Sequence, residues 1–440
     1  MRVGGGRKSD GGMRLEVGDG PRNQSLRPQA SNLFSLQPPT SNASHLNLLR
    51  KLLLVAFCCG MPLSGAWAAE WTALPSIGVT GLYNDNLFLT PLPHHETYGL
   101  LVTPAVEFSG KTERLNVSSQ VKGIFASYYG ERQFNFFNLH LPFSIRYQTE
   151  KDMLGFTGGF VRDHTLAGEL LDTGLVLGFT QRNQWTANPT WVRKITENLS
   201  FQSGLQLSDT TYEDGLRLGL RNFQLFGGSG GLLYHLTEQD EIRLSGSYSD
   251  YHTTNAPLSF RASFPGVDLS LTHAFTETLT GTVFGGPSFV SSSIQTVGGS
   301  IKSERLIWRF GGSLAKKFEY TSIQVNVARS IQPSGFGGLV QTDRAGVTIS
   351  HNLSDALSAS LNGSVFKTSS LTPSQLGATF PESRFASVTP AIAWKFLEWW
   401  KLELSYTYGR REVDGFPDPS ISNATMFMLT YYPPKLSFSN

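Results

Sequence analysis

The stretch WKLELSYTYGR, Trp400–Arg410, decides the fold class because two kinds of side chain alternate along it. Every second position holds a large apolar or aromatic residue: Leu402, Leu404, Tyr406 and Tyr408. The positions between them hold charged or small polar residues: Lys401, Glu403, Ser405, Thr407 and Gly409. A period of two predicts an extended strand with one apolar face and one polar face. What the apolar face contacts then separates a membrane protein from a soluble one.

The same pattern recurs along most of the chain after residue 69. In FNLHLPFSIRYQ (137–148), the odd positions are apolar or aromatic and most of the even positions are polar. Similar alternation occurs at 115–129, 154–160, 199–208, 242–248, 306–314, 323–327, 388–396 and 425–431. No helical period competes with it. The sequence therefore predicts an all-β fold.

The connections between these runs differ systematically in length. Short polar turns are expected at 111–114, 149–152, 196–198, 237–240, 276–278, 319–322, 353–356 and 397–400. Nine longer links rich in Gly, Pro, Asp, Asn and Ser alternate with them, for example LTPLPHHET (89–97), RDHTLAGELLDTG (162–174), TVGGSIKSE (296–304), LTPSQLGATFPES (371–383) and REVDGFPDPSIS (411–422). Eight short turns flanked by nine longer links predict about 18 strands, with 16 as the alternative.

This asymmetry is typical of bacterial outer-membrane barrels, whose strands alternate apolar-out and polar-in. A sheet can cross a bilayer only when it closes on itself, because hydrocarbon offers its backbone no partner. A soluble sandwich or propeller would also alternate, but its strands usually have about 5 or 6 residues, and no blade-length repeat is present. We therefore predict a transmembrane, antiparallel, up-and-down β-barrel.

Composition agrees with a chain that is rich in apolar groups yet has few continuous apolar runs. Aromatic residues make up 12% and charged residues only 16%, against roughly 25% charged residues in soluble domains. The mean hydropathy is nevertheless −0.15. The net charge of +2 gives no indication of a nucleic-acid partner.

Residues 46–68 resemble a secretory signal peptide. Arg50 and Lys51 precede the apolar segment LLLVAFCCGMPL, and Ala66-Trp67-Ala68 forms an A-x-A cleavage site. The apolar core is shorter than the roughly 20 residues that a membrane-spanning helix needs. Cleavage after Ala68 would leave 69–440 as the barrel and would remove both cysteines of the chain. Residues 1–45 are expected to be a disordered extension or a mis-assigned translation start.

Four prolines interrupt predicted strands: Pro104, Pro189, Pro287 and Pro390. Proline has no N–H group to donate to a ladder, so we expect a local bulge at each of them. Pro433-Pro434 likewise predict that the last strand ends near Tyr432.

Three groups of residues could supply the base of a hydrolase: Asp163 with His164, Asp250 with His252, and His94-His95-Glu96. All of them lie in or beside the predicted longer links, where polar residues are ordinary. The sequence contains no nucleophile motif, phosphate-binding loop or metal-ligand spacing. We therefore expect no catalytic residue, no metal and no cofactor, and we expect that the protein is not an enzyme.

Projecting the alternation inward assigns thirteen residues to the wall of the lumen: Glu107, Lys122, Asn138, His140, Arg146, Arg182, Gln184, Arg243, Asp268, Arg309, Lys395, Lys401 and Glu403. Seven are cationic and three are acidic. A barrel of 16 to 18 strands can hold an aqueous channel, and a cationic wall favours anionic solutes. The alternative is that these charges pair with one another and only stiffen the wall.

Two segments near the start, SIGVTGLYNDNLFLTP (76–91) and VTPAVEFSGKTERLNV (102–117), and one at the end, SNATMFMLTYYPPKLSF (422–438), resemble a known family. They are similar to outer-membrane β-barrel proteins that accompany exopolysaccharide and PEP-CTERM sorting systems. This resemblance implies an envelope component in a Gram-negative bacterium that acts as an exit channel, and it implies no catalytic residue.

The function predicted is that of a porin-like outer-membrane channel that serves the export of exopolysaccharide or another envelope component. The alternatives are a non-conducting scaffold or adhesin and a surface hydrolase. The expected partners are outer-membrane lipid and lipopolysaccharide, the barrel-assembly machinery, and polysaccharide or other envelope-export components. No nucleic acid is expected.

Overall fold

The computed structural model describes residues 70–91, 94–130, 133–166, 168, 179–254, 259–296, 299–371 and 381–439. The chain divides into the units Met1–Gly65 and Ala66–Asn440, and everything described here belongs to the second. The predicted extension 1–45, the signal peptide 46–68 and its cleavage site lie outside the described residues and stay predictions. Within the described ranges, no helix is long and apolar enough to span a membrane.

The described chain consists almost entirely of β-strands. They are β1 (Glu70–Asn84), β2 (Thr97–Lys111), β3 (Leu115–Gly130), β4 (Phe134–Gln148), β5 (Asp152–His164), β6 (Gln181–Lys194), β7 (Leu199–Tyr212), β8 (Phe223–His235), β9 (Asp240–Thr253), β10 (Ser259–Ser263), β11 (Gly266–Thr276), β12 (Leu279–Thr296), β13 (Gly299–Lys317), β14 (Thr321–Ser334), β15 (Gly338–Asn352), β16 (Leu357–Ser370), β17 (Ser383–Leu397), β18 (Trp400–Val413), β19 (Ser420–Tyr431) and β20 (Leu436–Ser439). A short 3₁₀ helix, η1 (Gly215–Leu218), precedes β8.

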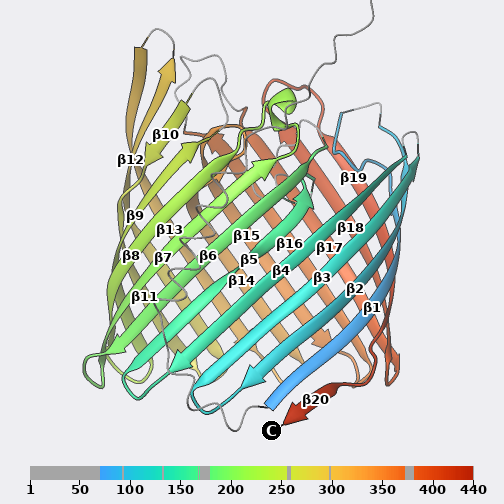
Figure 1. Ribbon diagram of the computed structural model, residues 1–440, viewed down its shortest axis with the longest axis horizontal. Coiled ribbons are helices and arrows are strands. Elements are labelled where there is room, and N and C mark those ends of the chain that lie inside the picture. The colour runs from blue at the N-terminus through green and yellow to red at the C-terminus, as the bar shows by residue number, and fades with distance from the viewer. Residues whose placement is uncertain are drawn as a thin grey trace, which may run out of the picture. The chain divides into compact units, whose positions relative to one another are not determined.

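The strands form one closed antiparallel barrel (Figure 1). Each strand pairs with its neighbours in the chain, and β1 pairs with both β2 and β19, which closes the sheet. β10 and β11 pair with successive parts of β9 and of β12, so together they occupy one strand position. β19 and β20 likewise pair with successive parts of β1. The barrel therefore has 18 strands, as the sequence predicts.

The C-terminal part of the chain agrees with the prediction up to the two prolines and differs from it beyond them. β19 ends at Tyr431, and the prolines interrupt the ladder as expected. The chain then returns to the sheet, because β20 pairs with the first residues of β1, from Glu70 to Ala73. The predicted end near Tyr432 is thus confirmed for β19, whereas the additional short strand β20 was not predicted. A proline pair removes N–H donors locally but does not prevent pairing to resume beyond it.

The links at the two ends of the barrel differ in length, but the difference is smaller than predicted. The eight predicted short turns all lie at the end of the barrel where β1 begins. At the other end, the link 297–298 has two residues, and the links 131–133 and 335–337 have three each. The prediction of a long link at TVGGSIKSE was wrong, because most of these residues belong to β12 and β13, which pair with each other up to Thr296 and Gly299. This hairpin projects beyond the neighbouring strands at the upper left of Figure 1.

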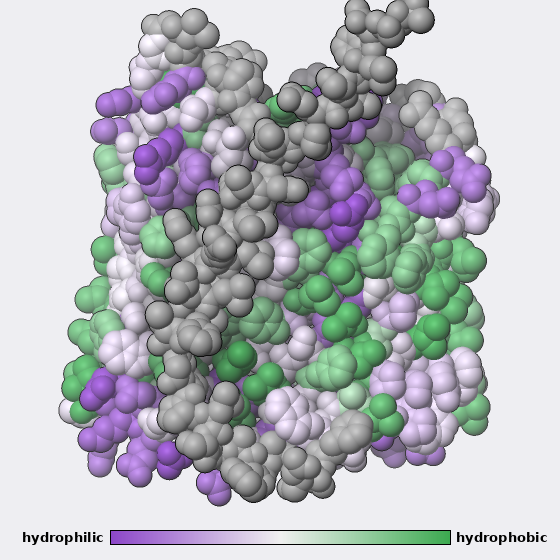
Figure 2. All heavy atoms as spheres, viewed as in Figure 1, coloured by the Kyte–Doolittle hydropathy of each residue, from purple (hydrophilic) through white to green (hydrophobic). Residues whose placement is uncertain are grey.

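The pairing register shows which side chains share a face, because cross-strand partners point to the same side of a sheet. Leu404 pairs with Ile392 on one side and Phe427 on the other, and these three side chains are about half exposed, at 50 to 51%. The cross-strand pairs continue this assignment around the barrel, so that Val79 in β1 also lies on the outer face. Figure 2 shows hydrophobic side chains across the middle of the visible face and hydrophilic ones toward both ends. The outer wall is therefore apolar.

The prolines interrupt the ladder in a different way from that predicted. The β2–β3 register is the same on both sides of Pro104, and only the pairs at 103 and 104 are missing. Equivalent two-residue gaps without a shift occur beside Pro189, Pro287 and Pro390. The prediction of bulges at these four prolines was wrong. Losing one donor costs a local pair but requires no extra residue.

Close approach of two strands at Gly286 provides a test of the register. A Cβ atom at this position would lie 1.7 Å from the carbonyl oxygen of Val267. We expect Gly286→Ala to lower the free energy of unfolding by about 1–3 kcal/mol, because the backbones must separate. Urea unfolding in detergent, followed by tryptophan fluorescence, measures this loss. Gly246→Ala is the matched control, since nothing lies within 4 Å of its added Cβ. Equal stability of the two variants would contradict the register.

Candidate functional site

The inner wall of the barrel is the candidate site. The register places twelve of the thirteen predicted wall residues on the face opposite the exposed apolar side chains. The thirteenth, Lys395, lies in an irregular part of the β17–β18 ladder and is assigned to this face by alternation from Trp394. For example, Glu403 pairs with Ala393 and Met428, while its neighbour Leu404 pairs on the outer face. The part that these residues play in passing a solute stays a prediction.

Five of the thirteen form a continuous patch across β3 to β7: Lys122, Asn138, His140, Arg182 and Gln184. Lys122 pairs with His140, and Asp163 pairs with Arg182. Arg182 donates to both carboxylate oxygens of Asp163, with Nε–Oδ1 and Nη2–Oδ2 distances of 2.9 and 2.8 Å. These two side chains are only 9% and 6% exposed. Gln184 donates to Thr210 Oγ1 at 3.2 Å.

Other predicted wall charges pair elsewhere on the inner face. Arg309 forms an ion pair with Asp268 and donates to Ser247 Oγ at 3.2 Å. Lys401 lies 2.9 Å from Glu403, and Arg243 lies 3.6 Å from Glu241. These pairs support the alternative in which charges stiffen the wall.

Four predicted wall charges lie apart from these pairs. Within the described ranges, no ion pair involves Glu107, Lys122, Arg146 or Lys395. The inner wall is therefore only partly neutralised by its own carboxylates.

Sequence reasoning missed further charges on the inner face. Arg305, Arg344 and Arg411 share the parity of the wall residues. Arg411 simply continues the alternation of the first stretch quoted, so the signal was present. It is 7% exposed, and its Nε and Nη1 have no hydrogen-bond partner among the described residues. Cations outnumber carboxylates on this face even when Asp163 and Glu241 are included.

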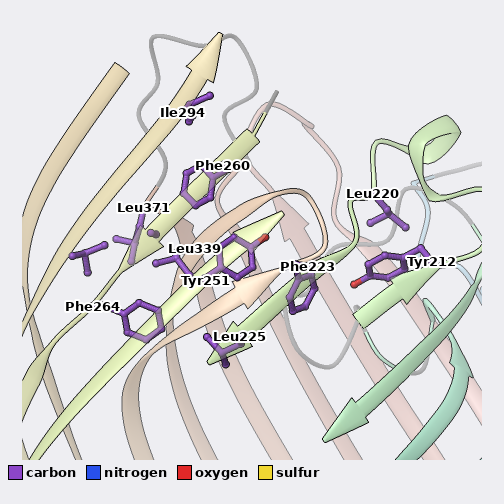
Figure 3. Packing of buried hydrophobic residues seen from close by; sticks show 12 residues of the cluster. Tyr212, Leu220, Phe223, Leu225, Tyr251, Phe260, Phe264, Ile294, Leu339 and Leu371 are labelled. Carbon is purple, nitrogen blue, oxygen red and sulfur yellow. The ribbon is translucent and has the colours of Figure 1, made fainter. Parts of the chain in front are cut away.

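Near the mouth that carries the longer links, buried apolar side chains gather on the inner face. A buried set of side chains, the mouth cluster, lies there (Figure 3). It consists of Tyr212, Leu220, Phe223, Leu225, Tyr251, Phe260, Ala262, Phe264, Val290, Ile294, Leu339 and Leu371. β7 to β12 contribute most of it, whereas Leu339 and Leu371 come from β15 and the end of β16. Strands that are not neighbours in the wall therefore meet inside the barrel.

The tip of the β14–β15 hairpin makes the contact between strands that are not neighbours in the wall. Tyr251 Oη donates to the carbonyl of Ser334 at 3.1 Å, and the N–H of Arg221 donates to the carbonyl of Gly335 at 2.6 Å. Gly337 permits the turn because its φ of 86° suits glycine. Phe336 packs against the mouth cluster. The hairpin thus leans across the mouth and narrows it.

The β1–β2 link narrows the mouth from another side. Leu89 is 4% exposed and packs against Phe366 and Phe385 on the inner faces of β16 and β17. Asn86 anchors the link, because its side-chain amide donates to the carbonyls of Thr90 and Ile421 at 2.8 Å each.

The carboxylates of the three catalytic candidates are engaged by other residues. Asp163 binds Arg182, Asp250 binds Arg261 at 2.6 Å, and Glu96 accepts from Tyr98 Oη at 3.1 Å. His164 packs between aromatic rings, with its centroid 4.4 Å from that of Phe136.

Within the described ranges, no group of three or more His, Cys, Asp or Glu residues could hold a metal ion.

Together, the wall and the mouth define a class: a closed 18-stranded antiparallel barrel with an apolar exterior and a polar, cation-rich interior. No protein-family model and no curated protein matches the chain. The chain is similar to Pseudomonas aeruginosa OccK5 (OpdH), at 12% identity and a TM-score of 0.40, over 84% of this chain and 98% of that one. P. aeruginosa OccK2 (OpdF) in complex with glucuronate matches at 7% identity and a TM-score of 0.42, over 83% and 98%. The alcaligin outer-membrane receptor FauA of Bordetella pertussis matches at 11% identity and a TM-score of 0.42, over 82% and 76%.

Proposed function

We propose that the protein is an outer-membrane channel of a Gram-negative bacterium. The observation that carries the proposal is the wall itself: large apolar side chains cover its outside, and polar and charged ones cover its inside. Soluble monomers rarely expose apolar surface on this scale, whereas a lipid-facing barrel requires it. The protein passes polar solutes and performs no chemistry on them.

The solute that the wall favours is anionic. The wall residues with the inward parity include more Lys and Arg than Asp and Glu, and an excess of positive charge along a channel raises the local concentration of anions. The resemblance of segments 76–91, 102–117 and 422–438 supports a place in the export of exopolysaccharide or another envelope component, after signal-peptide cleavage and insertion by the barrel-assembly machinery.

Planar-bilayer recording tests the channel directly. The purified protein should produce stepwise conductance in a bilayer of phospholipid, with a reversal potential that shows anion preference in a salt gradient. A folded, inserted protein that never conducts would contradict the proposal.

The anion preference should depend on the cations that no wall carboxylate neutralises. We expect the triple variant Lys122→Gln, Arg146→Gln, Lys395→Gln to lose most of its preference for chloride over potassium, since the local potential falls with each cation removed. The shift in reversal potential measures this change.

The control changes three basic residues that do not face the lumen: Arg114 and Lys151 in short turns and Lys316 on the outer face. Their replacement by Gln should leave the reversal potential near that of the unmodified protein. Equal shifts in both triple variants would show that net charge, and not the wall, sets the preference.

A non-conducting scaffold or adhesin is the second candidate, and the mouth cluster favours it. A mouth closed by packed side chains would pass no solute, and the outward-projecting β12–β13 hairpin would then be a binding surface. Conductance of the unmodified protein separates the two functions.

A further inference from the structure

The outer surface of β13 to β18 carries a groove that conduction through the lumen does not use. Its volume is about 610 Å³. The floor is made of small or medium apolar side chains, Val327, Ala345, Val365 and Ala386, and Phe310 forms one edge. Each of these residues has the parity of the outer face. An apolar chain could therefore lie in the groove against the wall.

A row of charged side chains crosses the groove, one from each of five neighbouring strands. In register order the row is Arg329, Asp343, Lys367, Arg384 and Glu412. It lies toward the mouth that carries the longer links, at the border of the apolar belt. Arg329 pairs with Asp343 through two contacts, at 2.5 and 2.9 Å. Its guanidinium also stacks over the Phe310 ring, 4.9 Å from the centroid.

The centre of the row has two cations side by side. Lys367 and Arg384 are directly opposite each other, an arrangement that costs stability when nothing offsets it. Both use the same carboxylate oxygen of Glu382, at 2.7 and 3.4 Å. The hydrogen bond from Lys367 lowers the pKa of Glu382, so this carboxylate stays ionised. The two cations are 45% and 61% exposed and keep an excess of positive charge.

We propose that this groove binds a phosphorylated, acylated glycolipid of the outer leaflet. Its phosphate lies at Lys367 and Arg384, and one acyl chain lies along the apolar floor. The inference rests on the proposed membrane location. A cationic row placed directly above an apolar surface matches an amphiphile whose anionic head is joined to hydrocarbon. An acidic peptide or a free anion would use the cations and leave the floor uncovered.

Binding to the purified full-length chain in detergent tests the site, with native mass spectrometry as the readout. Three probes separate the possible ligands: diphosphoryl lipid A, the same lipid without phosphates, and inorganic phosphate. The unmodified protein should bind the first probe in preference to the other two. Lys367→Gln/Arg384→Gln should weaken that binding by about tenfold or more, because two charge-assisted hydrogen bonds are lost.

The matched control removes two outward cations at the opposite end of the barrel. Arg193 and Lys316 both lie on the outer face beside short turns, so Arg193→Gln/Lys316→Gln should bind lipid A as the unmodified protein does. Equal affinity of the two double variants, equal binding of the dephosphorylated lipid, or binding of phosphate as tight as that of lipid A would overturn the proposal. Conductance of all variants in phospholipid bilayers should be unchanged. If lipid A does not bind, the proposed channel function is therefore unaffected. If lipid A binds but the protein does not conduct, only the channel function is contradicted.

Discussion

Shortening the β14–β15 hairpin is expected to raise single-channel conductance by about twofold or more, because ohmic flow follows the narrowest cross-section of a pore. The change replaces residues 332–340 by Asn-Gly, which leaves Ile331 and Gln341, a cross-strand pair, to flank a two-residue turn. It removes the carbonyls that Tyr251 and Arg221 bind, and Leu339 with them. Planar-bilayer recording at fixed salt measures the effect.

The control shortens a hairpin that does not cross the mouth. Removing residues 295–300 and joining Ile294 to Ile301 through Asn-Gly keeps the last pair of β12 and β13 below the tip. It deletes no member of the mouth cluster, so conductance should stay the same. Heat-modifiable migration on a gel confirms that both variants are folded. A shortened β14–β15 hairpin with unchanged conductance would show that this segment does not set the constriction.

Removing Arg182 alone should lower the free energy of unfolding by about 3 kcal/mol or more. Its partner Asp163 would remain charged in a site where its side chain is 6% exposed, and stranding one member of a buried ion pair is costly. Arg182→Met is the variant, and urea unfolding in detergent is the measurement. The double variant Asp163→Asn/Arg182→Met should recover much of the loss, because no buried charge is left behind.

An exposed ion pair provides the comparison. Lys435 lies 3.6 Å from Glu70, and both side chains are more than half exposed. Lys435→Gln should cost less than about 1 kcal/mol, since solvent screens such pairs. If Arg182→Met were as stable as this control, Asp163 and Arg182 would not form the buried pair described.

Alternation alone predicted the architecture well, for a physical reason. A strand in a closed barrel has one face outside and one inside along its whole length, so a period of two gives each residue's side without tertiary information. The parity of Leu404 and Glu403 follows directly. The prediction that the sheet closes into a barrel is also confirmed, and the first and last strands alternate as the central ones do.

The polarity of each face near the mouth could not be predicted in this way. In β16 the inward residue is Phe366 and the outward one is Lys367, which reverses the polarity found lower in the wall. β9 and β10 show the same reversal, with Tyr251 buried inside and the Asp250–Arg261 pair outside. Above the apolar belt the outer face meets polar surroundings, while the inner face packs against links that fold inward. Those packing contacts join residues far apart in the sequence, as Leu89 and Phe385 are, and no local pattern encodes them.

Spin labels on β18 test the central claim that lipid covers one face of each strand and water the other. Single cysteines would replace residues 402 to 407 one at a time, in a chain whose Cys58 and Cys59 are changed to serine, reconstituted in liposomes. Relaxation by oxygen, which concentrates in lipid, should peak at 402, 404 and 406, and relaxation by a water-soluble nickel complex should peak at 403, 405 and 407. Uniform accessibility along the strand, or protection of 402, 404 and 406 from both reagents as in a protein core, would contradict the account.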